Sequence, residues 1–155
     1  MNANALIARM LAATVLTVAI SSPGAPVTTT PPQIVDSEIA FALAHEPGGF
    51  ATSEHTAYWP TLGMTMESSL APRTLAVGSC ATGSFCAYSA LGLTGAKLSW
   101  GTCGTYSTAA ISSAKSVANA RTTGNVQALS SGTVVATVAP GKQSNVSLAT
   151  HVRCA

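Results

Sequence analysis

The chain has 155 residues, of which 47% are apolar, only 8% are charged and 5% are aromatic. Charged residues make up roughly 25% of an ordinary globular protein. The composition therefore excludes a highly charged disordered chain, a coiled coil and a polybasic nucleic-acid binder. The length fits one domain, or one small domain with an appendage. Hydroxyl-bearing and small residues replace the missing charges, which is common in exported proteins.

The N-terminus has the layout of a secretory signal peptide. An arginine and the amino terminus precede an apolar run over residues 10–20, which ends at Ser21-Ser22-Pro23-Gly24. This run is shorter than the roughly 20 residues that cross a membrane. We therefore expect a signal peptide over residues 1–21, cleaved near 21–25, a secreted protein, and no stable membrane insertion after cleavage. The Pro/Thr-rich segment 22–35 is predicted to be an extended linker.

Charge divides the rest of the chain into an acidic and a basic part. All five acidic residues lie between positions 36 and 67, whereas residues 68–155 contain six basic residues and no carboxylate side chain. Chance is one explanation in a charge-poor sequence. The alternatives are that the acidic segment 36–68 docks on the basic body, or that the body meets an anionic partner such as a cell-envelope polymer. The acidic segment could also be a pro-segment that is removed.

The four cysteines are predicted to form two disulfides. An even number of cysteines in an exported chain favours disulfides, and four cysteines allow three pairings. They stand at Cys80, Cys86, Cys103 and Cys154. A zinc site is not expected, because no C-x-x-C pair is present. Cys154 stands next to the last residue, so its bridge is expected to tie a terminal strand to the body.

Short strands separated by turn residues are predicted from residue 84 onward. The expected strands are Ser84–Ser89, Ala96–Trp100, Asn125–Leu129, Thr133–Val138 and Asn145–Val152. Ser130-Ser131-Gly132 gives the strongest hairpin signal, and residues 108–119 fit either a helix or a strand. In the acidic segment, a short helix is expected over residues 39–44, followed by a hairpin of 56–59 with 64–67. The pattern predicts an all-β fold, a small β-sandwich with two disulfides that is preceded by a short acidic segment.

No arrangement of catalytic residues is visible. His45, His55 and His151 are far apart in sequence, and neither Gly-x-Ser-x-Gly nor His-Glu-x-x-His occurs. Nucleophilic catalysis needs a base and an orienting group together. We therefore expect a protein that is not an enzyme and that carries no cofactor and no metal. His45 and His55, each beside a glutamate, are interpreted as solvated side chains, and His151 as a residue on the face of a strand.

The run GSCATGSFCAY over residues 78–88 resembles the secreted actinobacterial proteins grouped as peptidase inhibitor family I36. The later residues Thr94-Gly95, Leu98, Trp100 and Cys103-Gly104 continue the likeness. Ser116–Asn119, Val138–Gly141 and the segment 39–49 are also similar to parts of these proteins. The resemblance covers roughly residues 36–155.

This resemblance implies a βγ-crystallin-like Greek-key β-sandwich over residues 75–155. It also implies stoichiometric inhibition of an extracellular peptidase, of the metallopeptidase type, by a protein that we expect to be a monomer. The residues expected to determine the fold are Gly83, Phe85, Tyr88, Gly95 and Trp100. Tyr88 is expected to pack across a hairpin that Gly92 or Gly95 closes, where glycine supplies a positive φ or allows close approach of the ring.

Two loops are candidates for the inhibitory site. One is loop 101–108, whose candidate residues are Gly101, Thr102, Gly104, Thr105 and Tyr106, and the other is loop 89–97. A loop braced by a disulfide loses less entropy on binding. Crystallin-type modules often bind calcium through Asp or Asn shortly before a Ser-Ser pair, but Ser112-Ser113 stand here instead, so calcium is not expected. The alternative function is a non-inhibitory binding or structural module of the cell envelope, because fold does not determine function.

Overall fold

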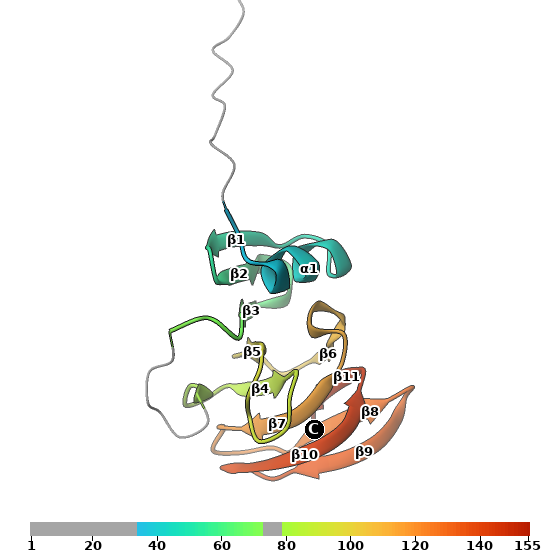
Figure 1. Cartoon of the computed structure of the whole chain (residues 1–155). Coiled ribbons are helices and arrows are strands. Elements are labelled where there is room, and N and C mark those ends of the chain that lie inside the picture. Colours follow the sequence, from blue (N-terminus) through green and yellow to red (C-terminus); the bar gives the residue numbers. More distant parts are fainter. Residues whose placement is uncertain (1–33, 73–78) are drawn as a thin grey trace, which may run out of the picture. The chain divides into compact units, whose positions relative to one another are not determined.

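The computed structural model describes residues 34–72 and 79–155 (Figure 1). The expected signal peptide and all but the last two residues of the expected linker lie outside the described residues. So do the first four residues of the predicted domain 75–155. Within the described part of the chain, no helix is long and apolar enough to cross a membrane.

The predominant secondary structure of the described chain is β-strand, arranged in two antiparallel sheets. The strands are β1 (Phe50–Ser53), β2 (Thr56–Trp59), β3 (Met64–Glu67), β4 (Phe85–Tyr88), β5 (Lys97–Trp100), β6 (Thr105–Ser107), β7 (Ala114–Asn119), β8 (Val126–Ser130), β9 (Thr133–Val138), β10 (Lys142–Ala149) and β11 (His151–Cys154). The helical elements are α1 (Ser37–His45) and the short 3-10 helices η1 (Pro60–Leu62) and η3 (Ala109–Ile111). The predictions of an all-β body, two sheets and two disulfides are confirmed.

The strand order divides the body into two units of four consecutive strands. One sheet has the order β1-β2-β3-β5-β4-β7-β10, and the other has the order β6-β11-β8-β9. In the first unit, β4 to β7, the third strand, β6, lies in the four-stranded sheet with β8, β9 and β11. In the second unit, β8 to β11, the third strand, β10, lies in the seven-stranded sheet beside β7. Each sheet is thus built from both units, and across the interior β10 contacts β8 and β9, and β7 contacts β9 (Figure 1).

Helix α1 forms where the sequence predicts a helix, and it is longer than the predicted 39–44. Asp36 is its N-cap, since the carboxylate accepts a hydrogen bond from the backbone N–H of Ile39 at 2.9 Å. Ile39 and Ala42 lie one helical turn apart on the buried face. After the helix, the chain turns at Pro47-Gly48, and at the next residue, Gly49, a Cβ atom would lie 2.2 Å from the Trp59 ring. Any larger residue at position 49 would displace the Trp59 side chain.

The acidic segment is part of the first sheet. Strand β3 pairs antiparallel with β5, with Met64 opposite Trp100 and Met66 opposite Leu98. Trp59 and both methionines are fully buried in the core that also contains the body residues. The predicted hairpin of 56–59 with 64–67 is confirmed as β2 and β3. The segment therefore shares a sheet and a core with the body.

The strands of the C-terminal half agree only in part with the prediction. The prediction of one strand over Asn145–Val152 is wrong, because the chain changes sheets at Thr150: β10 pairs with β7, and β11 pairs with β8 and β6. The backbone N–H of Thr150 donates to Leu129 at the crossing. Residues 108–119, which fit helix or strand, form η3 and then β7. The hairpin of β8 with β9 lies where Ser-Ser-Gly predicts it.

The disulfides join Cys80 to Cys86 and Cys103 to Cys154. The second bridge ties the last strand to the start of β6, as the position of Cys154 predicts. The sequence separations of the paired cysteines are 6 and 51. The chain-entropy model gives about 2 kcal/mol for the short loop and about 4 kcal/mol for the long one. The two bridges are therefore expected to contribute unequally to stability.

Replacing each pair by serine tests this difference. The Cys103→Ser/Cys154→Ser protein is expected to lose about twice as much free energy of unfolding as the Cys80→Ser/Cys86→Ser protein. Urea unfolding followed by tryptophan fluorescence measures both losses. Equal losses would contradict the expectation that the bridge to the C-terminus is the more important restraint.

Candidate functional site

The segment between β4 and β5, residues 89–96, forms a folded hairpin that we call the Leu91 hairpin. Leu93 turns back into the protein with φ +59° and packs with Tyr88 and the Cys80–Cys86 disulfide in a small separate core. Leu91, in contrast, is 59% exposed. The hairpin therefore anchors itself with one leucine and presents another to solvent.

Gly95 is required by the shape of this hairpin. Its φ is +78°, which disfavours residues with a side chain, and a Cβ atom would lie 2.3 Å from the hydroxyl oxygen of Ser89. That hydroxyl accepts a hydrogen bond from the backbone N–H of Ala96 at 2.9 Å. A residue larger than glycine would thus break the bond that closes the base of the hairpin.

Side chains from two other strands hold the hairpin in place. The buried hydroxyl of Ser116, on β7, donates to the carbonyl of Ala90 at 2.7 Å and accepts from the N–H of Leu93 at 3.0 Å. The side-chain oxygen of Asn145, on β10, accepts from the N–H of Gly92 at 2.9 Å. Backbone groups near the tip of the hairpin are thus fixed from outside it, and the exposed loop is pre-organised.

Loop 101–108 is braced in a different way. The Cys103–Cys154 disulfide holds it, and the N–H of Cys154 donates to the carbonyl of Gly104 at 3.0 Å. The Tyr106 ring stacks on Trp100 with the centroids 5.3 Å apart, and its hydroxyl lies 2.9 Å from that of Thr102. Of the candidate residues in this loop, Gly101, Thr102 and Thr105 are exposed, whereas Gly104 and Tyr106 are half-buried. The loop therefore presents small side chains.

The residues expected to determine the fold lie in or beside the core. Phe85, Tyr88 and Trp100 are fully buried, and the rings of Phe85 and Trp100 stack with centroids 5.4 Å apart. Gly83 has φ +85°, and its N–H donates to the carbonyl of Ala120. Among the described residues, the indole N–H of Trp100 has no hydrogen-bond partner.

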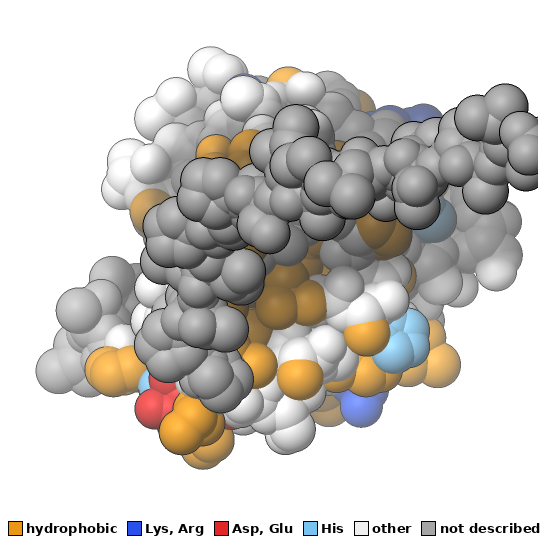
Figure 2. Space-filling view, turned by 90° about the horizontal axis from the view of Figure 1, so that it is seen from above, with side chains coloured by type: hydrophobic (Ala, Val, Ile, Leu, Met, Phe, Trp, Pro, Cys, Tyr) orange, Lys and Arg blue, Asp and Glu red, His pale blue; other side chains and the backbone are white. Residues whose placement is uncertain are grey.

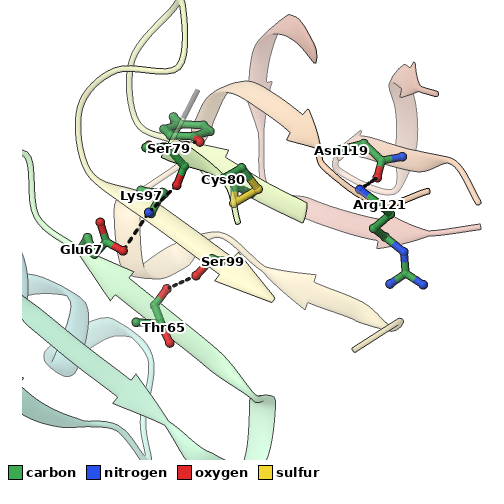
Figure 3. The surroundings of a disulfide bond; sticks show 10 residues. Thr65, Glu67, Ser79, Cys80, Lys97, Ser99, Asn119 and Arg121 are labelled. Carbon is green, nitrogen blue, oxygen red and sulfur yellow. Dashed lines mark hydrogen bonds and ion pairs between the residues drawn. A yellow bond between two sulfur atoms is a disulfide. The ribbon is translucent and has the colours of Figure 1, made fainter. Parts of the chain in front are cut away.

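Lys97 joins the acidic segment to the body (Figure 3). Its ammonium group lies 2.8 Å from the Glu67 carboxylate, on β3, and donates to the backbone carbonyl of Ser79 at 2.8 Å. The Lys97 side chain is only 10% exposed, whereas that of Glu67 is 34% exposed. An acidic residue of the segment therefore neutralises a buried cation of the body, which accounts for part of the uneven charge distribution.

Asp36 and His55 form a pair that the sequence interpretation missed. His55 Nδ1 lies 2.8 Å from the Asp36 carboxylate, and the His55 side chain is 28% exposed. The interpretation of His55 as a solvated side chain is therefore wrong. Burial acts to raise the pKa of Asp36, but hydrogen bonds from neighbouring side chains and from the N–H of Ile39 outweigh it and hold the pKa below its ordinary value. His45 contacts the carbonyl and the ring of Phe41, and His151 is exposed on β11.

The lowered pKa predicts a pH dependence of stability. The unfolded value is about 3.9, so the Asp36 carboxylate stabilises the fold above about pH 4, and this contribution is lost as the pH falls through the folded value. Asp36→Ala is expected to cost about 1 kcal/mol at pH 7, through loss of the helix cap. Thermal unfolding at pH 7, 5 and 3 measures the difference from the unchanged protein. A difference that does not shrink at pH 3 would contradict this assignment.

Metal-ligating side chains do not gather in the described residues, where no group of three or more His, Cys, Asp or Glu lies together. Ser112 and Ser113, where the sequence gives no reason to expect calcium, lie between η3 and β7.

Comparisons with known proteins give no match to a family model, to a curated protein or to a solved structure.

The sequence predicts loop 89–97 as one of two candidates, but it does not predict the residues elsewhere in the chain that hold this loop. Ser116 and Asn145 contact the hairpin across 23 and 53 positions of sequence, and a single sequence carries no sign of such contacts. The exposure of Leu91 could have been predicted from the sequence, because Leu91 lies between Ala90 and Gly92 in a turn and not in a strand that could bury it.

Proposed function

We propose that this chain is a secreted inhibitor of an extracellular peptidase, that it acts by stoichiometric binding, and that the Leu91 hairpin enters the active site. The observation that carries the proposal is the exposed Leu91 on a hairpin held by Ser116 and Asn145. A rigid loop loses little conformational entropy on binding. Its exposed leucine offers an anchor for an apolar pocket of a peptidase. The metallopeptidase class is implied by the I36 resemblance alone.

We also propose that the body is a βγ-crystallin-like Greek-key sandwich. In a Greek key, the fourth strand of a unit lies beside the first. Here β7, the fourth strand of its unit, lies beside β4, and β11 lies beside β8. The exchange of the third strands between the sheets and the hairpin folded over Tyr88 support the same proposal.

Secretion is part of this proposal. Stable disulfides form in oxidising compartments and are rare in the cytosol, and the four cysteines of the chain are all paired. The signal-peptide pattern in residues 1–21 supports export independently of the cysteines.

Substituting Leu91 tests which part of the molecule inhibits. Leu91→Asp is expected to weaken inhibition at least 30-fold, because an anchor residue typically contributes 2 kcal/mol or more. Leu148→Asp is the matched control, since Leu148 is similarly exposed, at 57%, and lies on β10 and not in the hairpin. Inhibition constants against one susceptible peptidase measure both effects.

The same experiment separates the two loops. If Thr105→Asp abolishes inhibition while Leu91→Asp leaves it unchanged, loop 101–108 is the inhibitory site and the assignment to the hairpin is wrong.

A non-inhibitory module of the cell envelope is the second candidate, favoured by exposed basic residues of the body. Lys115 and Lys142 are exposed, and residues 68–155 contain no carboxylate side chain. Among the described side chains that are visible in Figure 2, hydrophobic groups predominate, and Lys or Arg side chains appear at separate places. Co-sedimentation with anionic cell-wall material, weakening as salt is added, would support this candidate.

A further inference from the structure

A pocket of about 220 Å³ lies where the acidic segment meets the body. Helix α1, strand β3, the base of the Leu91 hairpin and helix η3 all contribute to its lining. Its inner part is apolar, because Met66 is fully buried and Ile111 nearly so, and Phe41 adds a half-exposed ring. The pocket is therefore suited to an alkyl chain.

The charge of this pocket comes from one residue. Among the side chains that line it, Glu38 alone is charged. One Glu38 oxygen, Oε2, accepts a hydrogen bond from the backbone N–H of Ser69. A carboxylate has about four lone-pair sites, so it can accept further hydrogen bonds from a ligand. Ser89 and Ser112 line the same pocket, and their hydroxyl oxygens can accept hydrogen bonds, although that of Ser89 already accepts one from the N–H of Ala96.

The backbone is strained at this site. Ser112 has φ +62° and ψ −53°, and the N–H of Ser113 donates to the carbonyl of Ile111 at 2.7 Å. These values describe a γ-turn of the rare, strained kind. Strain of this type is concentrated at binding sites and active sites, and here it fixes the position of Ser112 beside the pocket.

We propose that this pocket binds an alkyl chain that ends in a guanidinium group. The apolar inner surface takes the methylene groups, and the Glu38 carboxylate with the serine hydroxyls accepts the guanidinium N–H donors. A guanidinium group has five donors and is more weakly hydrated than an ammonium group, so it fits a partly enclosed site rich in acceptors. An anionic ligand would be repelled by Glu38.

An arginine side chain of a partner protein and a free alkylguanidine share this chemistry. The site differs from the tip of the Leu91 hairpin, and its ligand does not depend on peptidase inhibition.

The test is an NMR titration of the oxidised full chain with butylguanidinium, following the methyl signals of Met66 and Ile111. We expect saturable shifts of these signals. Glu38→Gln, which keeps the shape of the side chain and one acceptor oxygen, is expected to weaken binding roughly tenfold or more, because hydrogen bonds to charged groups are the stronger ones. Glu54→Gln is the matched control and is expected to bind as tightly as the unchanged protein.

Three further ligands keep the proposal falsifiable if Glu38→Gln does not fold. Butan-1-ol and pentanoate have the same apolar part without the cation, and equal binding of either to the unchanged protein would overturn the proposal. Unchanged butylguanidinium affinity in a folded Glu38→Gln protein would also overturn it. N-acetylarginine amide separates the sources: saturable binding of it indicates that a protein side chain can enter, whereas binding of butylguanidinium alone indicates a free alkylguanidine.

Discussion

A chain that begins at Ser79, and so lacks α1 and β1–β3, is expected to be unfolded at 25 °C. The missing segment contributes four large, fully buried side chains: Ile39, Trp59, Met64 and Met66. Burying each is worth about 1.5–3 kcal/mol, and small domains are stable by about 5–15 kcal/mol. The truncation would also expose the edge of β5 and leave the buried Lys97 without Glu67.

Circular dichroism and amide dispersion in NMR spectra measure this outcome. The chain that begins at Ile34 is the control and is expected to fold. Secretion is part of the proposal, so the mass of the protein recovered from the culture medium gives a second measurement, in which we expect residues 36–68 to be retained. A folded chain that begins at Ser79 would contradict the expectation that the body needs the segment. A recovered protein without residues 36–68 would show that the segment is a pro-segment that is removed.

Trp100→Ala is expected to cost about 3–5 kcal/mol in the free energy of unfolding. The indole is fully buried and stacks on the rings of both Phe85 and Tyr106, and the three ring centroids form a cluster 5.3–6.0 Å apart. On the neighbouring strand, Met64 lies directly opposite. Removing the side chain would leave a cavity that borders both the acidic segment and loop 101–108. Urea unfolding followed by far-ultraviolet circular dichroism measures the loss.

Trp100→Phe is the matched control. It keeps an aromatic ring in the stack and removes the indole N–H, which has no hydrogen-bond partner among the described residues. Leaving such a donor buried costs about 1–3 kcal/mol, so its removal offsets part of the lost packing. We expect a loss less than half that of the alanine variant. Equal losses would contradict the importance of the aromatic stack.

Local patterns were enough to predict most strands. Phe85–Tyr88 and Lys97–Trp100 are short apolar segments bounded by turn residues, and both form strands there. The hairpin around Ser131 and Gly132 is equally local, since both residues have positive φ in the turn. The number of cysteines was enough to predict two disulfides, but not which cysteines pair.

Contacts between distant parts of the chain could not be predicted. The alternation from Asn145 to Val152 fits one strand, because a period of two says nothing about which sheet a residue joins. The pairing of β3 with β5 and the Asp36–His55 pair each join distant parts of the sequence. The Leu91 hairpin depends on Ser116 in the same way. These long-range contacts place the acidic segment in the core and fix the candidate site.

The central claim is that this protein inhibits a peptidase, and one titration tests it most directly. Oxidised protein without residues 1–21, with both disulfides verified by mass, is added in increasing amounts to each member of a panel of secreted metallopeptidases and serine peptidases. The proposal predicts that the activity of one peptidase falls linearly and reaches its minimum near one equivalent. Full activity of every peptidase at a molar excess of folded protein would contradict it and would favour the cell-envelope module.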